Sequence, residues 1–247
     1  MKPAYETIGR TYTRTRRPDP RIAARIAAAL GDARTVVNVG AGAGSYEPNG
    51  SFVVGVDPSP TMLAQRADDA GPAVVAVGEH LPFPDVTFEA AMATLTLHHW
   101  PDVKRGLAEM RRVARRQVVF FFEPANSMAY WLGDYCPEVL QLPSERNAPG
   151  TDDIAAVLDV RSVEAVPVPA DCTDGFGGAY WNRPERYLEP DVQAGISSFA
   201  QLDPAARDDF TRRLRDDLES GAWDAKFGHL REQAECDLGY LLLTAGS

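Results

Sequence analysis

A glycine-rich segment that follows an apolar run is the feature of this sequence best suited to bind a cofactor. The run Val36–Val39 leads directly into residues 40–44, where glycine occupies alternate positions. Glycines allow the chain to turn sharply and to approach a ligand closely. A second apolar run, 52–56, ends at Asp57, whose carboxylate can accept hydrogen bonds from both hydroxyls of a ribose. This pattern predicts a cofactor that contains adenosine.

Two adjacent histidines, His98 and His99, follow another apolar run and could take part in proton transfer. A structural role is the alternative, with one ring packed and the other hydrogen-bonded to the backbone. No H-x-x-x-H or C-x-x-C pattern accompanies the pair, and adjacent residues of an extended chain point to opposite faces. We therefore predict no metal site.

The elements that must position these residues alternate between strands and helices. Apolar runs predict strands, and apolar residues at helical spacing predict helices. The alternation predicts an α/β fold with a parallel sheet that helices cover on both sides. The predicted strands are 36–39, 52–56, 73–77 (buried), 88–95, 117–122 (central), 161–168 and 237–244, and the predicted helices are 22–30, 101–114, 151–158, 204–221 and one after Pro60 that carries Met62, Leu63 and Ala67.

Composition narrows the class of protein. With 247 residues, 45% of them hydrophobic and 24% charged, the chain can form a full globular core. A net charge of -10 with few lysines argues against nucleic acid or an anionic membrane surface as partner. The three cysteines form no C-x-x-C pattern, so we expect free thiols in a reducing compartment. No apolar run resembles a signal peptide or a membrane span, and we expect a cytoplasmic protein.

Four motifs follow one another in order: 36–44, 55–62 (GVDPSPTM), 79–89 (EHLPFPDVTFE) and 97–102 (LHHWPD). Together they resemble the class I S-adenosylmethionine-dependent methyltransferases, in particular the small-molecule, ubiquinone/menaquinone-type branch known as type 11. The resemblance covers the first half of the chain. It implies a Rossmann-like, doubly wound sheet of seven strands, mostly parallel with an antiparallel last strand, to which a lid and a helical, aromatic insertion are added.

The resemblance also implies roles for individual residues. The glycine loop passes beneath the methionine part of the cofactor, Asp57 holds the ribose, Pro58 and Met62 flank the adenine, and the loop 78–81 covers its edge. The residues predicted to bind the cofactor are Gly40, Ala41, Gly42, Gly44, Asp57, Pro58, Met62, Gly78, Glu79, His80 and Thr94.

Two positions depart from the family pattern. Asn38 stands where the family usually has an acid, although an amide can still donate and accept hydrogen bonds. Near Val77 the family often has an aspartate that meets the adenine amine. Glu79 could replace that aspartate or face solvent.

We expect a single methyltransferase domain over residues 1–247. The insertion should lie over the open end of the sheet, on the substrate side. The predicted parts are an N-terminal arm (1–20), a cofactor-binding core (21–124), a lid (125–150), the rest of the core (151–169 and 234–247) and the insertion (170–233).

Aromatic residues of the second half could form the core of the lid and insertion or the walls of an acceptor pocket. The group comprises Trp100, Tyr130, Trp131, Phe176, Tyr180 and Trp181. From it we predict Trp100, Tyr180 and Trp181 as acceptor-binding residues, together with Tyr12 of the arm. We expect Arg14, Arg16 and Arg17 to be solvated, although the family's N-terminal segment often folds over the cofactor, which keeps Tyr5 a candidate.

The predicted function is in-line transfer of a methyl group from S-adenosyl-L-methionine to a small aromatic or apolar acceptor of secondary metabolism, with S-adenosyl-L-homocysteine as product. O-, N- and C-methylation all stay open. His98 or His99 would be the base if the acceptor must lose a proton. The alternatives are a non-catalytic cofactor-binding partner protein and a nicotinamide-dependent oxidoreductase. No lysine follows a tyrosine by four positions, which argues against the short-chain type of the latter.

Overall fold

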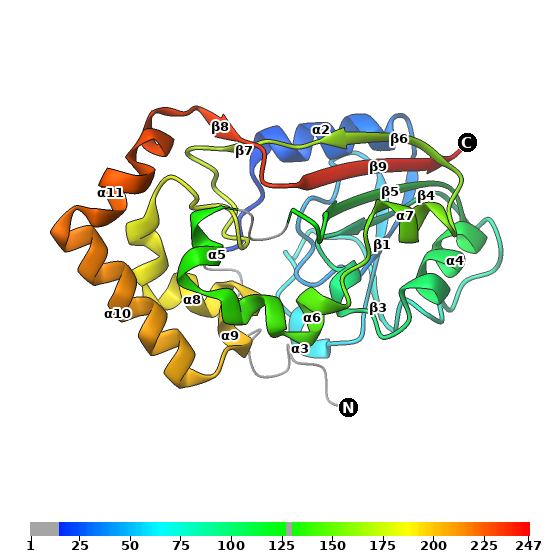
Figure 1. Cartoon of the computed structure of the whole chain (residues 1–247). Helices are drawn as coiled ribbons and strands as arrows, with labels where there is room; N and C mark the ends of the chain where they lie inside the picture. Colours follow the sequence, from blue (N-terminus) through cyan, green and yellow to red (C-terminus); the bar gives the residue numbers. More distant parts are fainter. Residues whose placement is uncertain (1–14, 127–129) are drawn as a thin grey trace.

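The computed structural model describes residues 15–126 and 130–247, and its centre is a seven-stranded sheet (Figure 1). The strand order is β3-β2-β1-β4-β5-β9-β6. β9 is antiparallel to both of its neighbours, whereas the other strand pairs of this sheet are parallel. This confirms the predicted α/β, Rossmann-like fold. The strands are β1 (Thr35–Val39), β2 (Phe52–Asp57), β3 (Ala73–Val75), β4 (Phe88–Thr94), β5 (Ala114–Phe122), β6 (Val160–Ala165) and β9 (Tyr240–Gly246).

Alternate residues of the inner strands pack on opposite faces of the sheet. Val36 of β1 belongs to an apolar cluster with Ile22 and Ile26 of helix α2 (Pro20–Leu30). Its neighbour Val37 belongs to a second cluster, which includes buried residues of α4 (Val103–Val113) and the region of α7 (Thr151–Ala155). The period of two along a strand thus places helices on both faces.

The strand order brings the predicted motifs to one edge of the sheet. β1, β2 and β4 are parallel, so that the chain leaves all three at the same edge. β1 lies between β2 and β4, and the connections from β1 to these two neighbours diverge. Ligands of open α/β sheets bind at such a point, next to the carboxyl ends of the strands.

Three predicted elements differ most from the structure. The strand 73–77 is β3, which covers only Ala73–Val75 and is not buried, because β3 is the edge of the sheet and pairs with β2 alone. Val75 is accordingly 58% exposed. The helix after Ser59, α3, ends already at Leu63. The run 161–168 is divided, since β6 ends at Ala165 and Val168–Pro169 (β7) joins a separate two-stranded sheet with β8 (Glu235–Cys236).

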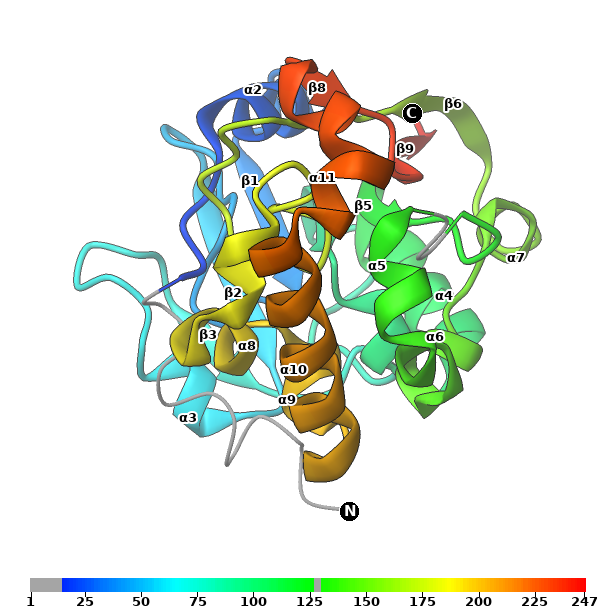
Figure 2. The same cartoon turned by 60° about the vertical axis from the view of Figure 1, so that its left-hand side comes forward.

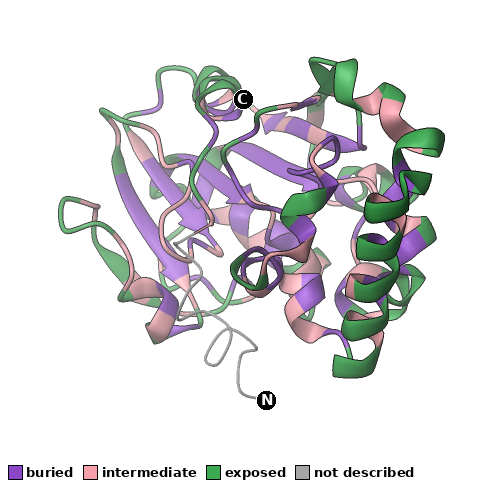
Figure 3. Cartoon of the chain, turned by 90° about the vertical axis from the view of Figure 1, so that its left-hand side faces the viewer, coloured by how far each residue is buried: buried purple, intermediate pink, exposed green. Residues whose placement is uncertain are grey.

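Short helices from the second half of the chain lie beside the carboxyl edge of the sheet (Figures 1 and 2). Figure 3 shows the strands largely buried and the long helix α10 exposed along one side. The elements after β5 are α5 (Trp131–Tyr135), the 3-10 helix η3 (Pro137–Gln141) and α6 (Pro143–Arg146), and after β7 they are η4 (Pro184–Leu188), α8 (Pro190–Gly195), α9 (Ser197–Gln201), α10 (Pro204–Ser220), α11 (Ala222–Phe227) and η5 (Gly228–Glu232).

The insertion shares an apolar cluster with one face of the sheet. Phe120 of β5 and Trp181 of the insertion belong to the same cluster, as do Trp131 and Trp223, whose ring centroids lie 5.5 Å apart. Burial of such large rings is a major source of folding free energy. In the part of the chain that the structure describes, no helix combines the length and the apolar character that crossing a membrane requires.

Candidate functional site

The loop after β1 has a backbone that only glycine adopts readily. Gly40, Gly42 and Gly44 have φ angles of 75°, 50° and 89°. A Cβ atom on Gly40 would lie 2.1 Å from the hydroxyl of Thr96. The loop is held in place because the backbone N–H of Gly40 donates to the carbonyl of Val56, at 2.8 Å. Side chains are thus excluded where the loop turns against the neighbouring strands.

Asp57 ends β2 beside this loop, and the backbone fixes both of its carboxylate oxygens. Oδ2 accepts from the backbone N–H of Gly42 and Oδ1 from that of Ser59, each at 2.8 Å. Burial raises the pKa of the Asp57 carboxyl, while these two hydrogen bonds oppose the shift. The carboxylate is oriented in advance and retains lone pairs that can accept from a ligand.

Asn38 contributes an acceptor atom to the same place. Its Nδ2 donates to Oε1 of Glu47 at 3.0 Å, and Glu47 in turn forms an ion pair with Arg66 at 2.7 Å. Because a carboxylate only accepts, the amide nitrogen must face Glu47. The buried Asn38 Oδ1 has no hydrogen-bond partner among the described residues. It is therefore a candidate acceptor for a donor group of the cofactor.

These residues line a pocket that opens to solvent and contains about 530 Å³ of empty space with its mouth included, which we call the cofactor cavity. Of the residues predicted to bind the cofactor, Gly40, Ala41, Gly42, Asp57, Met62 and Thr94 line it, whereas Gly44, Pro58, Gly78, Glu79 and His80 do not. The remaining lining residues are Arg16, Asn38, Ala43, Ser45, Leu95, Thr96 and His99.

Two of the predicted residues outside the cavity have evident structural contacts. Glu79 accepts a hydrogen bond from the backbone N–H of Asp102 at 3.0 Å, at the start of α4. Gly78 packs beneath Trp100, whose ring lies 3.2 Å from where a Cβ of Gly78 would be. Trp100 packs in the same way over Gly106 of α4. The structure thus places Trp100 against the backbone of two segments rather than in a cavity wall.

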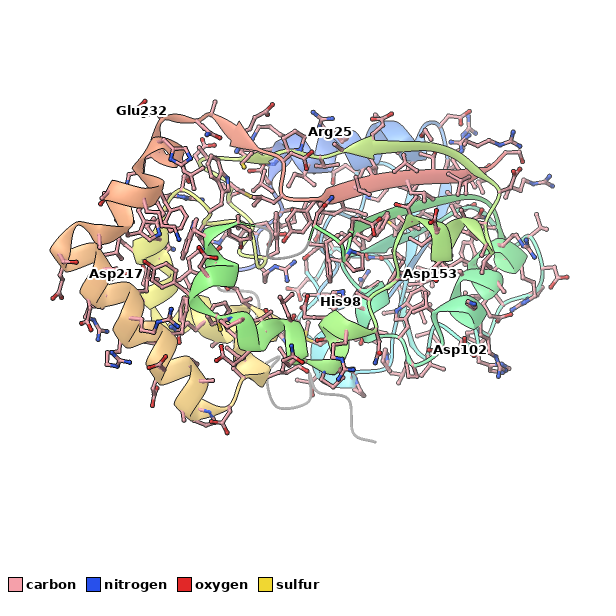
Figure 4. All side chains as sticks on the ribbon, viewed as in Figure 1. Arg25, His98, Asp102, Asp153, Asp217 and Glu232 are labelled. Carbon is pink, nitrogen blue, oxygen red and sulfur yellow. The ribbon has the colours of Figure 1, made fainter. Side chains whose placement is uncertain are left out.

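A second pocket adjoins the first, and we call it the acceptor cavity. It also opens to solvent and contains about 700 Å³ of empty space with its mouth included. Its walls come from the segment before α2, the segment after β4, the end of β5, the lid, the insertion and the start of β9. Figure 4 shows His98, one of its lining residues, near the middle of the molecule, between the sheet and the helical side. The lining residues are Arg16, Leu95, His98, Phe122, Tyr130, Val139, Glu145, Phe176, Gly177, Gly178, Ile196, Ser197, Ser198, Leu238 and Tyr240.

Arg16 and Leu95 line both cavities. The prediction that Arg16 is solvated is wrong, because its side chain is only 9% exposed and its Nε lies 2.6 Å from Oδ1 of Asp174. The hydroxyl of Tyr46 donates to the other oxygen of Asp174 at 2.8 Å. Tertiary ion pairing, which local sequence does not reveal, keeps this arginine inside. Arg17, in contrast, is exposed.

Leu95 has a φ of 49°, although its side chain is bulky. A leucine in the left-handed region is uncommon and costs on the order of 1 kcal/mol. Its backbone N–H donates to the carbonyl of Phe120 at 2.7 Å, which helps to hold the conformation. Strained backbone of this kind often occurs at functional sites, and here it lies where the two cavities meet.

His98 and His99 line different cavities, but not through the alternation of an extended chain that we expected from the sequence, because Leu97–His99 is a 3-10 helix (η2). His98 lines the acceptor cavity and His99 the cofactor cavity, and their ring centroids lie 3.8 Å apart. Burial, with Arg16 as a further cause, lowers the pKa of His99 to about 4 and holds that of His98 well below its ordinary value. Both rings are therefore neutral at pH 7.

The other predicted acceptor-binding residues do not line the acceptor cavity. Trp181 is fully buried, and its Nε1 donates to the carbonyl of Val168 at 3.0 Å. Tyr180 is also buried, with the Arg183 guanidinium 5.1 Å from its ring centroid. Tyr12, like Tyr5 and Arg14, lies outside the described residues.

Sequence reasoning missed several residues of the acceptor cavity. It considered Tyr130 and Phe176 only as members of the aromatic group, and it passed over Glu145 and Tyr240. Glu145 belongs to the short helix α6, in a segment whose sequence has no regular pattern, and Tyr240 begins an ordinary apolar strand, so neither carried a local signal. Within residues 15–126 and 130–247, no three His, Cys, Asp or Glu side chains gather as a metal site would require.

Comparison with known proteins agrees with this geometry. Residues 37–122, from β1 to the end of β5, match the model of a family described as a methyltransferase domain. Demethylmenaquinone methyltransferase of Corynebacterium kroppenstedtii is 37% identical over 84 residues, which are 32% of this chain and 37% of that protein. A tRNA (carboxymethyluridine(34)-5-O)-methyltransferase of Schizosaccharomyces pombe is 32% identical over 82 residues, or 32% of this chain and 35% of that protein. The match spans about a third of the length of these relatives.

Similarity to solved structures extends over more than nine-tenths of the chain. A structure described as a methyltransferase from an antibiotic biosynthesis pathway of Anabaena variabilis has a TM-score of 0.85 and 29% identity, with 94% of this chain and 99% of that chain covered. Geranyl diphosphate C-methyltransferase of Streptomyces coelicolor, with a TM-score of 0.53, 16% identity and coverage of 92% and 78%, shares the fold. These findings confirm the predicted resemblance to the class I S-adenosylmethionine-dependent methyltransferases and the methyltransferase assignment of the cofactor-binding half.

Proposed function

On the basis of this methyltransferase fold, we propose that the protein transfers a methyl group from S-adenosyl-L-methionine to a small acceptor and releases S-adenosyl-L-homocysteine. The observation that carries the proposal is the meeting of two cavities at Arg16 and Leu95. One cavity has the glycine loop and Asp57, and the other has aromatic walls. Methyl transfer requires this arrangement, since two ligands must meet end to end.

The residues of the cofactor cavity fit this cofactor. Asp57 would accept from the ribose hydroxyls, the glycine loop would lie against the methionine part, and Asn38 Oδ1 would accept from its ammonium group. Met62 offers an apolar surface for the adenine. When bound, the cofactor supplies a methyl group on a positively charged sulfur, which makes the methyl carbon an electrophile.

The protein's own contribution is orientation and control of charge. Because His98 and His99 are neutral at pH 7, they add no positive charge beside a cationic cofactor. Asp174 partly compensates the charge of Arg16. His98 would orient the acceptor and, if the acceptor arrives protonated, would accept its proton. Because the pKa of His98 is low, the ring would then release that proton to solvent.

A small aromatic or apolar acceptor is supported by the walls of the acceptor cavity. Phe122, Phe176 and Tyr240 line it, and the rings of Phe176 and Tyr240 pack with centroids 4.7 Å apart. The similar Anabaena variabilis structure, from an antibiotic biosynthesis pathway, supports an acceptor of secondary metabolism. The tRNA methyltransferase relative matches less than half of the chain, and the net charge of -10 favours a small molecule over tRNA.

In this proposal the lid (125–150) and the insertion (170–233) serve the acceptor, and the rest of the single domain serves the cofactor and completes the acceptor cavity with residues such as Phe122 and Tyr240. The wall residues support that division, since Glu145 comes from the lid and Phe176 and Ile196 from the insertion. A non-catalytic cofactor-binding protein would retain the first cavity, but nothing would require the second to adjoin it.

Isothermal titration with S-adenosyl-L-homocysteine tests the proposal, with NADH as the matched control for a nicotinamide-dependent enzyme. We expect micromolar binding of the former and none of the latter. A folded protein that fails to bind S-adenosyl-L-homocysteine contradicts the proposal. With an acceptor in hand, His98→Ala should keep that affinity and slow turnover, whereas a wild-type rate would remove His98 from the catalytic residues.

A further inference from the structure

The acceptor cavity has opposite charges at different places in its wall. Arg16 belongs to the part that adjoins the cofactor cavity. Burial is the main cause of the low pKa of the two adjacent histidines, and the positive charge of Arg16 adds to it. Glu145 of α6 adds to the raised pKa of Tyr130, for which burial is again the main cause, whereas Tyr240 is subject to both charges, since Glu145 raises its pKa and Arg16 lowers it. Arg16 lines both cavities and its partner Asp174 lines neither, so the ion pair turns its positive end toward the place where methyl transfer would occur.

Arg16 is also rigidly held. Nε and Nη2 of its guanidinium face the two oxygens of Asp174 at 2.6 and 3.4 Å, and Asp174 is 1% exposed. The hydroxyl of Tyr46, also buried, donates to Asp174. A guanidinium fixed by a buried partner keeps its position when ligands bind.

A fixed positive charge at this point favours one kind of nucleophile. The sulfonium of the cofactor and the guanidinium of Arg16 would repel each other across the junction, less strongly than two full charges because Asp174 compensates part of the charge of Arg16. An anion between them is attracted to both and lowers the energy of the arrangement. Neither His98 nor His99 competes with Arg16 for the anion, since both histidines are neutral.

Building on the proposed function, we propose that the acceptor reacts through an ionised hydroxyl group of the phenol type, which Arg16 holds beside the cofactor cavity. The aromatic walls formed by Phe122, Phe176 and Tyr240 suit the ring to which such an oxygen is attached. Glu145 is the one carboxylate among the described wall residues, and its charge acts on Tyr130. Glu145 would disfavour a second negative charge of the acceptor near Tyr130.

The step balances without another reactant. The acceptor binds as the phenolate, its proton having gone to solvent. The oxygen–carbon bond forms as the carbon–sulfur bond breaks, and the electron pair of the latter stays on the sulfur. A neutral methyl ether and a neutral thioether result, so that the attraction to Arg16 ends with the reaction and favours product release.

The experiment uses 4-nitrophenol, which ionises near neutral pH and whose phenolate absorbs visible light. It is titrated over pH in the presence of protein saturated with S-adenosyl-L-homocysteine. We expect the apparent pKa of the bound probe to fall by at least one unit, a tenfold change in its ionisation constant. In wild-type protein, 4-nitroanisole, which cannot ionise, should bind at least tenfold more weakly at pH 8.

Variants test whether Arg16 causes the shift in the apparent pKa of the bound 4-nitrophenol. Arg16→Lys retains the charge and should retain much of the shift. The pair Arg16→Met with Asp174→Leu removes both charges, which avoids an unpaired buried carboxylate, and should abolish the shift. Arg17→Met, an exposed neighbour, is the matched control and should behave as wild type.

The inference is overturned if the bound probe titrates as it does in water, if the double variant shows the wild-type shift, or if the loaded protein binds no nitrophenol. It fails separately from the proposed function, because binding of S-adenosyl-L-homocysteine is measured first. Loss of that binding contradicts the proposed function itself.

Discussion

The two cavities are built in different ways. The cofactor cavity takes most of its wall from three short segments, at the ends of β1, β2 and β4, that are neighbours in one parallel sheet. The acceptor cavity draws on segments as far apart as Arg16 and Tyr240. A wall made of successive strand ends is specified by short motifs, whereas a wall assembled from distant segments depends on how those segments pack.

Arg16, which lines both cavities, is held by its ion pair with Asp174. Breaking this ion pair should have the largest effect on the protein, and the effect should be on stability. Asp174→Leu leaves a buried guanidinium and the Tyr46 hydroxyl without their partner. We expect a loss of about 3 kcal/mol in the free energy of unfolding, measured by urea denaturation. Arg16→Met in the same chain should restore most of it.

Lys226→Met is the matched control for that prediction, because the Lys226–Asp134 pair is exposed on both sides. Its cost should stay below about 1 kcal/mol. Equal losses from the two single variants would show that the buried pair is no more important than a surface contact.

A change at Gly40 should affect the cofactor cavity while leaving the acceptor cavity formed. Gly40→Ala combines a φ of 75° with a clash against Thr96. We expect at least a hundredfold weaker binding of S-adenosyl-L-homocysteine by calorimetry, roughly 2.7 kcal/mol. Gly50→Ala has a similar φ of 88° but no atom within 4 Å, so it should carry backbone strain without loss of affinity. If both variants bind alike, the close approach at Gly40 is unimportant.

The histidine pair predicts how stability depends on pH. The pKa of His99 is about 4 in the folded protein, below the ordinary value of 6.5, so the unfolded chain binds more protons between these values. Its stabilising contribution is complete above pH 6.5 and lost as pH falls toward 4. Allowing for the partial exposure of His99, we expect the free energy of unfolding to fall by about 2 kcal/mol between pH 6.5 and pH 4. The variant His99→Gln should show a smaller fall. The exposed His229→Gln is the control, and an equal reduction there would contradict the assignment.

The smallest expected effect concerns Asp57. Asp57→Ala should weaken binding of S-adenosyl-L-homocysteine at least tenfold, about 1.4 kcal/mol, because the ribose loses its charged acceptor. Since burial raises the pKa of Asp57, wild-type affinity should also fall as pH is lowered toward that pKa. Asp69→Ala, an exposed neighbour, should leave affinity unchanged. Unaltered binding by Asp57→Ala would exclude it from the site.

Sequence reasoning was strongest where neighbouring residues decide the structure. Helix α2 begins after Asp19, whose side chain accepts from the N–H of Arg21, and ends before Gly31 with a φ of 62°, so local signals mark both ends. The strand at 73–77 was misjudged, because apolar character alone does not distinguish an inner strand from the exposed edge occupied by Val75.

Within the candidate site the same division holds. The sequence by itself determined the strand–loop geometry at Gly40 and the position of Asp57 at the tip of β2, since φ preferences and strand periodicity act over a few residues. Only the tertiary structure decided that Arg16 is buried against Asp174, that Trp181 packs in the core and that Glu145 faces the acceptor cavity. The burial and charge environment of a side chain depend on segments distant in sequence, and these are fixed only when the whole chain packs.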